Sequence, residues 1–278
     1  MAAYHQPLTL KDLLPHGPLG RLGQRAFVLE TVDSTNQFLL QHAGEAGDGA
    51  VAHAEQQTAG RGRLGRRWEA PRGSSVLLSV LLIEPADTPL VSHGALLAAL
   101  AACEAVEAAT DCSPAVRWPN DLALGNRKLG GVLAESGVLA ANEAAAGAPR
   151  SANRAVVIGV GINCLQQRPH FKGPLARTAT SLECESARPV DRAAVASGVL
   201  ARLDYWLELC RQQPDGWTQM RSAWRRRCED VGTRVTLEHD ARVFAGTALD
   251  IADNADLLVQ LDEGGRRHFA AATTTRVW

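Results

Sequence analysis

The sequence has little net charge, and it lacks a secretion signal and a long uninterrupted apolar run. Its formal net charge is −1 over 278 residues, which is unlike the strongly basic surface of a general nucleic-acid or membrane binder. The apolar stretch 95–103 is followed by Glu104 and Glu107, so we expect it to fall short of membrane-spanning length. No basic start followed by an apolar run marks a signal peptide. These absences predict a cytoplasmic protein with no membrane partner.

Paired cysteines are also missing. None of the six cysteines forms a C-x-x-C pair, and none clusters with histidines. We therefore expect free thiols in a reducing compartment and predict no metal site built from protein ligands. A chain of this length can bury a full core, and one large domain with a smaller one is a natural division.

The most informative segment is 57–68, which reads QTAGRGRLGRRW. Four arginines and three glycines lie within residues 60–67. Glycine lets backbone amides face a ligand without an intervening side chain, and arginine offers a planar fork of donors for phosphate or carboxylate oxygens. The segment predicts a loop that binds a dense anion, although a solvated basic turn is the plain alternative.

Two familiar phosphate-binding motifs almost fit this segment. Residues 60–65 satisfy G-x-G-x-x-G, but a dinucleotide fingerprint needs a helix directly after the glycines. Residues 68–73 cannot form one, and 75–83 has the pattern of a strand. A P-loop would need Lys and then Ser or Thr, which are absent here. The residues around the glycines therefore fit neither a dinucleotide fingerprint nor a P-loop.

Hydrophobic spacing and turn signals predict the remaining elements. A helix is expected after the capping residues at 33–36, another over 96–106, and two more between 191 and 227 with a break near 214–216. The predicted strands are 26–31, 50–56, 75–83, a hairpin of 122–124 with 129–138, and 155–162. Short alternating stretches follow at 234–237, 243–251, 257–261 and 268–272 and predict a small all-β module.

Four more polar clusters lie at predicted strand ends or turns, where binding residues concentrate. Each also has a plain structural interpretation: an N-cap, a turn, a solvated hairpin lysine, or a turn after a buried strand. The clusters are Ser34-Thr35-Asn36, Trp118-Pro119-Asn120-Asp121, Lys128 to Gly131, and Gly159 to Asn163.

In their order along the chain, these clusters resemble the motifs of the biotin protein ligases. The matching segments are 31–36, 57–68, 117–121, 127–135 and 158–163. The resemblance implies an α+β fold of the kind shared with class II aminoacyl-tRNA synthetases and lipoate ligases, with a mixed sheet and packed helices. It divides the chain into a catalytic domain at 1–229 and an SH3-like β-barrel at 230–278.

The implied reaction has two steps. The carboxylate of biotin attacks the α-phosphate of ATP, with Mg²⁺ on the departing pyrophosphate, and biotinyl-5′-AMP forms. A lysine of the biotin carboxyl carrier protein of acetyl-CoA carboxylase then takes the biotinyl group. Residues 1–25 are interrupted by prolines and glycines that prevent a long helix, so we expect the ligase-only form without a DNA-binding domain and without a DNA partner.

The resemblance also implies roles for individual residues. Arg63, Lys128 and Asp121 are the expected catalytic residues. Arg63 is expected to bridge the carboxylate and the α-phosphate together with Arg61 and Gly62. Lys128 holds the mixed-anhydride oxygens, and Asp121 orients or deprotonates the incoming lysine. The biotin side is expected to be lined by Ser34, Thr35, Asn36 and Gln57. The other expected ligand-binding residues are Gly60, Arg61, Gly62, Trp68 at the adenine, Asn120, Gly131, Gly161, Asn163 and Arg276.

One part of the family pattern is missing. The segment 271–275 reads AATTT where the family usually has Gly-Glu-x-Ser, just before the expected adenosine contact at Arg276. Two alternatives to the ligase stay open: a lipoate–protein ligase, and a biotin-responsive regulator without turnover. The sequence leaves the oligomeric state open, with a homodimer among the options.

Overall fold

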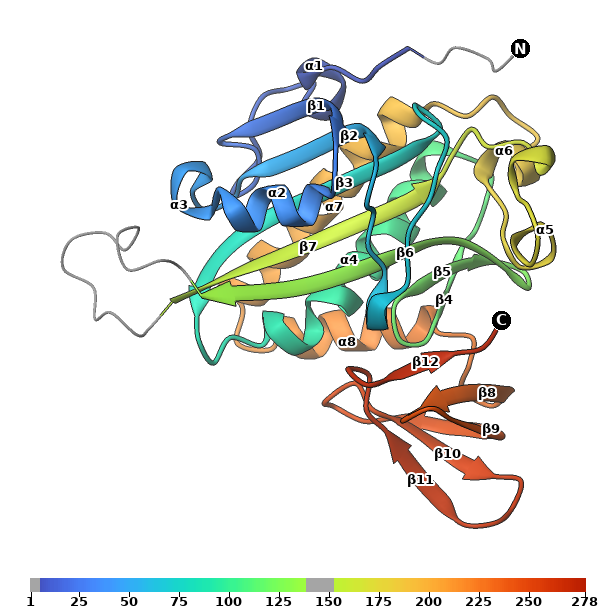
Figure 1. Ribbon diagram of the computed structural model, residues 1–278. Coiled ribbons are helices and arrows are strands. Elements are labelled where there is room, and N and C mark those ends of the chain that lie inside the picture. Colours follow the sequence, from blue (N-terminus) through green and yellow to red (C-terminus); the bar gives the residue numbers. More distant parts are fainter. Residues whose placement is uncertain (1–5, 139–152) are drawn as a thin grey trace.

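A computed structural model describes residues 6–138 and 153–278. Its main feature is a seven-stranded mixed sheet with the strand order β1-β2-β3-β7-β6-β5-β4 (Figure 1). The strands β1 and β2 pair in parallel, and the other neighbours are antiparallel. The strands are β1 (Ala26–Val32), β2 (Val51–Gln57), β3 (Ser75–Pro85), β4 (Ala115–Arg117), β5 (Asp121–Leu124), β6 (Arg127–Val138) and β7 (Asn153–Asn163).

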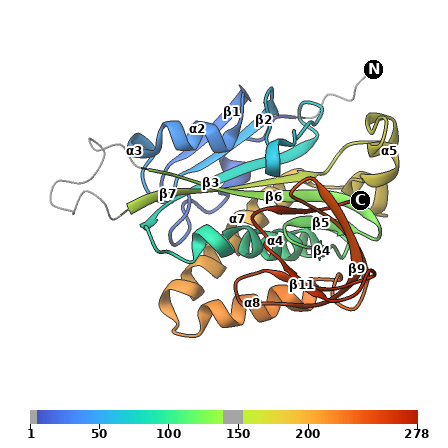
Figure 2. The ribbon, with the colours of Figure 1, turned by 60° about the horizontal axis from the view of Figure 1, so that its bottom comes forward.

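Helices cover this sheet on both faces. Figure 2 shows α2 (Thr35–Gln41) and α3 (Ala43–Ala46) on one side, with α4 (Leu90–Ala109), α7 (Arg192–Gln212) and α8 (Gly216–Arg227) on the other. The short helices are α1 (Leu10–Leu13), η1 (Arg63–Gly65), η2 (Arg168–His170), α5 (Leu175–Thr178) and α6 (Leu182–Glu185). The main core lies between the sheet and the α4–α7 layer, and a smaller core cluster is buried beneath α2 and α3.

The helix α4 corrects one expectation from the sequence. Glu104 and Glu107 lie within the helix and do not end it. By length and composition alone, its 20 residues could cross a membrane. However, 72% of the most apolar 18-residue stretch of this helix is buried inside the fold. Packing against the sheet and α7 therefore explains the apolar composition of α4.

The C-terminal part of the chain forms a second, antiparallel sheet with the order β11-β10-β9-β8-β12. Its strands are β8 (Arg234–His239), β9 (Arg242–Ile251), β10 (Leu257–Leu261), β11 (Arg266–Phe269) and β12 (Thr274–Arg276). The expected strand at 268–272 is wrong in its extent. The chain turns after β11, where Thr274 N–H donates to the Ala270 carbonyl at 3.1 Å, and it then returns as β12 beside β8.

A buried carboxylate, Asp230, joins the two sheets. It accepts a hydrogen bond from the Trp118 backbone N–H at 2.6 Å and one from Arg117 at 3.3 Å, and it forms an ion pair with Arg276. The Trp118 indole donates in turn to the Ala255 carbonyl at 2.8 Å. Because Asp230 is only 1% exposed, these contacts hold β12 firmly against the turn after β4.

Most of the predicted elements are confirmed, including the hairpin of β5 and β6 and the two helices α7 and α8. The cysteines are all free, and all except Cys184 are buried. Burial raises the pKa of the Cys103 and Cys164 thiols to about 12. Such thiols stay protonated and behave as small apolar core residues.

Candidate active site

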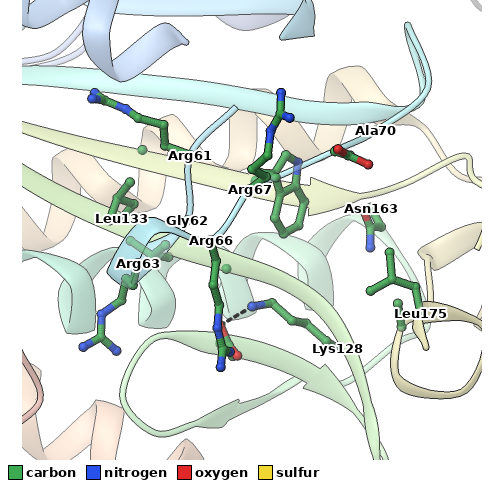
Figure 3. A pocket seen from close by; sticks show the side chains of 18 of the residues that line it. Arg61, Gly62, Arg63, Arg66, Arg67, Ala70, Lys128, Leu133, Asn163 and Leu175 are labelled. Carbon is green, nitrogen blue, oxygen red and sulfur yellow. Dashed lines mark hydrogen bonds and ion pairs between the residues drawn. The ribbon is translucent and has the colours of Figure 1, made fainter. Parts of the chain in front are cut away.

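A large pocket opens on the α2 side of the main sheet, with a volume of about 770 Å³. Its walls come from the segment after β2, from β5, β6 and β7, from the segment 166–179 and from the end of the chain. Figure 3 shows the arginine side chains of the first segment on the same side of the sheet as Lys128. The expected site residues that line it are Ser34, Thr35, Asn36, Gln57, Arg61, Gly62, Arg63, Trp68, Asn120, Asp121, Lys128, Gly131, Gly161, Asn163 and Arg276.

Glycines make the floor of this pocket. Gly161 of β7 pairs with Gly131 of β6, so neither strand places a side chain at that level of the sheet. A Cβ added to Gly161 would lie 2.9 Å from the Trp68 indole, closer than packed carbon atoms approach. The Gly-x-Gly motif of β7 therefore lets Trp68 lie close against the strand backbone.

The arginine-rich segment is a short hairpin. Gly62 N–H donates to the Arg66 carbonyl at 2.7 Å, and Trp68 N–H donates to the Gly60 carbonyl at 3.0 Å. Leu64 at the tip has a φ of 52°, a conformation that L-residues avoid. All four arginines of this hairpin line the pocket.

Gly60 is the exception among the expected ligand-binding residues. It does not line the pocket, and a Cβ at this position would collide with the Trp68 carbonyl oxygen. Gly60 is thus required at the base of the hairpin, where the two strands approach closely. Backbone packing alone therefore requires a glycine at this motif position.

A hydrogen-bond network holds the polar residues at the start of α2. Ser34 caps the helix, as its position predicted. The Gln57 Oε1 atom accepts from the Thr35 backbone N–H at 2.8 Å and from its hydroxyl at 3.1 Å. Ser79 Oγ lies 2.7 Å from Thr35 Oγ1 and 2.6 Å from Asn36 Oδ1. These buried groups therefore have fixed directions before any ligand arrives.

Arg61 lies at the same end of the pocket. Its guanidinium forms an ion pair with Glu135 of β6 at 3.0 Å, and Asn36 donates to the same carboxylate oxygen at 2.9 Å. The Arg61 Nε–H is buried without a hydrogen-bond partner among the residues that the structure describes. A buried donor without a partner is costly, so a ligand acceptor at this position would be favoured.

Arg63 reaches across to the C-terminal sheet. It donates to Asn120 Oδ1 at 3.1 Å, to the Thr274 carbonyl at 3.2 Å and to the Ala271 carbonyl. Burial lowers the pKa of this guanidinium, and the neighbouring Asp121 carboxylate opposes that shift. A desolvated positive charge in a pocket attracts an anion more strongly than one in water.

Lys128 is not the solvated hairpin lysine of the plain interpretation. Its Nζ atom lies 2.6 Å from Asp121 Oδ1, and its side chain lines the pocket (Figure 3). At the far end of the same wall, Asn163 donates to the Thr180 carbonyl at 2.9 Å and accepts from Gln166 at the same distance. The two hydrogen bonds fix the Asn163 amide at the end of β7.

Several residues in or beside the pocket were not expected from the sequence. Glu135 lies inside a matched motif, which could have indicated its role. Ser79 is a single serine between the apolar residues of β3 and gave no such indication. The segment 166–179, with Phe171 and Leu175, carries no recognisable motif. Trp278 lines the pocket from the end of the C-terminal sheet, and nothing in its local sequence indicated that position.

Residues 6–138 and 153–278 contain no group of three or more His, Cys, Asp or Glu side chains that could hold a metal ion. Asp121 is an acidic residue of the pocket, and it is engaged by the Lys128 cation. The described residues therefore do not form a metal cage of their own. A metal arriving here would need most of its oxygen ligands from a phosphate chain and water.

Comparison with known proteins agrees with the fold and the motifs. Residues 28–148 match the model of the biotin/lipoate A/B protein ligase family. The chain is 34% identical over 247 residues to the biotin–[acetyl-CoA-carboxylase] ligase of Mycobacterium tuberculosis, covering 86% of this chain and 84% of that protein. It is 30% identical over 251 residues to the bifunctional ligase/repressor BirA of Bacillus spizizenii, covering 90% and 74%.

Solved structures show the same fold. The biotin protein ligase from Aquifex aeolicus in complex with biotin and ATP superposes with a TM-score of 0.70 at 24% identity, covering 91% of this chain and 99% of that one. A mutant of that ligase in complex with biotin gives a TM-score of 0.73 at 23% identity, covering 91% and 98%. The fold and pocket define a biotin/lipoate ligase-type enzyme. Within that class, the chain belongs to the biotin protein ligase family, as its motifs predicted.

Proposed function

We propose that this chain ligates biotin, through biotinyl-5′-AMP, to a lysine of a biotin carboxyl carrier protein. The observation that carries this proposal is the convergence of five separate sequence motifs on one pocket. Membership of the biotin protein ligase family supports it, as does the identity with a named biotin–[acetyl-CoA-carboxylase] ligase.

The α2 end of the pocket suits the ureido ring of biotin. That ring has one carbonyl acceptor and two N–H donors, and the hydroxyls and amides of Ser34, Thr35, Asn36 and Gln57 offer complementary groups. A lipoyl dithiolane has no N–H or carbonyl groups with which these side chains could form hydrogen bonds. The polar network therefore favours biotin over lipoate.

The first step brings a carboxylate onto a polyphosphate, so positive charge is needed where negative charge develops. Arg61, Arg63 and Lys128 provide that charge from two sides of the pocket. Trp68 offers an aromatic face, and Asn120, Gly131 and Arg276 complete the nucleotide side. Mg²⁺ would neutralise the pyrophosphate when bound. Since the described residues form no cage for it, its ligands would come mainly from ATP and water.

In the second step, the amine of the acceptor lysine attacks the acyl carbonyl and AMP leaves. Asp121 lies beside Lys128, where it can orient the amine or take its proton. An acyl adenylate is strongly activated, so correct placement of the amine supplies much of the rate.

We retain residues 1–229 as the catalytic domain and 230–278 as the C-terminal domain, because the second sheet begins with β8 just after this boundary. The buried free thiols fit a reducing cytoplasm.

The test is pyrophosphate release by the purified chain with ATP, Mg²⁺ and either biotin or lipoate. We expect release with biotin and little with lipoate, followed by biotinylation of a carrier domain. A carrier whose target lysine is replaced by arginine is the control. Pyrophosphate release with lipoate alone would identify the chain as a lipoate–protein ligase. Biotin binding without pyrophosphate release would identify it as a biotin-responsive regulator without turnover.

A further inference from the structure

The end of the C-terminal sheet contributes an aromatic residue to the pocket. The Trp278 indole Nε1–H donates to Asp121 Oδ2 at 2.9 Å. The other oxygen of the same carboxylate, Oδ1, lies 2.6 Å from Lys128 Nζ. Asp121 is therefore held between a cation of the main sheet and an indole of the second sheet.

Trp278 also contacts a second charged group. The Arg276 guanidinium carbon lies 5.8 Å from the centroid of the Trp278 ring, within the range of a cation–π interaction. The backbone is fixed at this point, because Arg276 pairs with Leu237 and Val277 N–H donates to the Thr236 carbonyl at 2.9 Å. The position of Trp278 is thus set by the pairing of β12 with β8.

A carboxylate with one bound oxygen can rotate, whereas one with a different donor on each oxygen has a fixed plane. Asp121 is mostly shielded from water, with a side-chain exposure of 13%, so hydrogen bonds to it are weakly screened. We propose that Trp278 is a positioning residue that fixes the Asp121 carboxylate for the acceptor amine and holds Arg276 toward the nucleotide. This inference rests on the proposed function, in which Asp121 serves the transfer step.

Two substitutions separate the two contacts. Trp278→Phe removes the indole N–H and keeps an aromatic ring for Arg276. We expect it to slow transfer from preformed biotinyl-5′-AMP by roughly tenfold, the scale of a hydrogen bond to a charged group, and to leave the KM for ATP unchanged. Trp278→Ala removes the ring as well and should also raise the KM for ATP.

Trp206 provides a matched control. Its indole Nε1–H also donates to a carboxylate, Glu104, at 2.9 Å, but between α7 and α4 and away from the pocket. Trp206→Phe deletes the same kind of hydrogen bond, so we expect its melting temperature to fall while both half-reactions keep their rates.

A double-mutant cycle with Asp121→Asn tests whether Trp278 acts through Asp121. In that background, Trp278→Phe should cause no further loss of transfer rate. Unchanged transfer by Trp278→Phe would overturn the inference, and so would equal losses in both half-reactions. A wild-type chain that makes no adenylate would instead reject the proposed function, so the two failures are distinguishable.

Discussion

Gly159 of β7 packs directly against Asn36 of α2, with no room for a side chain between them. A Cβ added to Gly159 would lie 2.9 Å from Asn36 Cγ and closer still to its Oδ1. Asn36 also donates to Glu135 at 2.9 Å and to the Leu133 carbonyl at 3.1 Å. Because Gly159 has no Cβ, Asn36 can take the position in which it makes these hydrogen bonds at the α2 end of the pocket.

Gly159→Ala should displace Asn36 and weaken biotin binding. We expect the KM for biotin to rise by about tenfold, because a misplaced polar group loses a hydrogen bond worth about 1 kcal/mol or more. The KM for ATP should change far less. Gly137→Ala is the control, since an added Cβ there meets only Leu40 at an ordinary 3.4 Å. Equal KM values for biotin in the two variants would contradict this role.

Lys128→Ala should lower the rate of adenylate formation by a factor of about 10² or more, because one donor at a developing charge is typically worth about 3–4 kcal/mol. The measurement is biotin-dependent exchange of pyrophosphate into ATP. Arg127→Ala serves as control, since Arg127 is the adjacent cation and pairs with Glu185 at 3.5 Å. Near-normal exchange by Lys128→Ala would remove Lys128 from the mechanism.

Asp230→Asn should weaken both the fold and nucleotide binding. It removes a buried charge from between Arg117 and Arg276, and breaking a buried pair typically costs about 3–5 kcal/mol. We expect a lower melting temperature and a KM for ATP raised by about tenfold as Arg276 loses its anchor. Glu229→Gln is the control, because Glu229 pairs with Arg117 from a side chain that is 56% exposed. An unchanged KM for ATP in Asp230→Asn would show that Arg276 does not need this anchor.

Acid should destabilise the fold through Glu55. Burial opposes its ionisation, but hydrogen bonds from His53, Arg192 and the Leu8 backbone outweigh burial and lower its pKa from 4.5 to about 2. A lowered pKa gives stability that is complete above pH 4.5 and is lost as the pH falls toward 2, by about 3 kcal/mol.

The measurement is the free energy of unfolding between pH 6 and pH 2. Glu55→Gln should be destabilised at neutral pH, because Arg192 then lies buried without its partner, and it should lack the loss below pH 4.5 that belongs to Glu55. Glu30→Gln is the exposed control. The same acid-dependent loss in Glu55→Gln would assign that loss to other groups.

The sequence predicted the elements well, because their signals are local. The capping serine Ser34, the break near Pro214 and the apolar run of β7 each describe a structure within a few residues. The site was predicted by resemblance of motifs, and the reason that these motifs meet is topological. β7 lies between β3 and β6, which brings Gly161 beside Gly131 and under Trp68.

Other features could not be predicted in this way. Asp230 and Trp278 act on partners more than a hundred residues earlier in the chain, and neither belongs to a motif. Gly60 belongs to a motif but is needed for the hairpin backbone. A glycine in a binding loop can be required because a ligand approaches closely or because the loop packs closely on itself. Its position in the sequence does not show which reason applies.

The most direct test of the proposed site is a crystal structure with biotinyl-5′-AMP bound. We expect the ureido ring among Thr35, Asn36 and Gln57, and the phosphate between Arg63 and Lys128. The adenine should contact Trp68. A phosphate bound outside the space between Arg63 and Lys128, or a ureido ring away from α2, would contradict this assignment of the pocket.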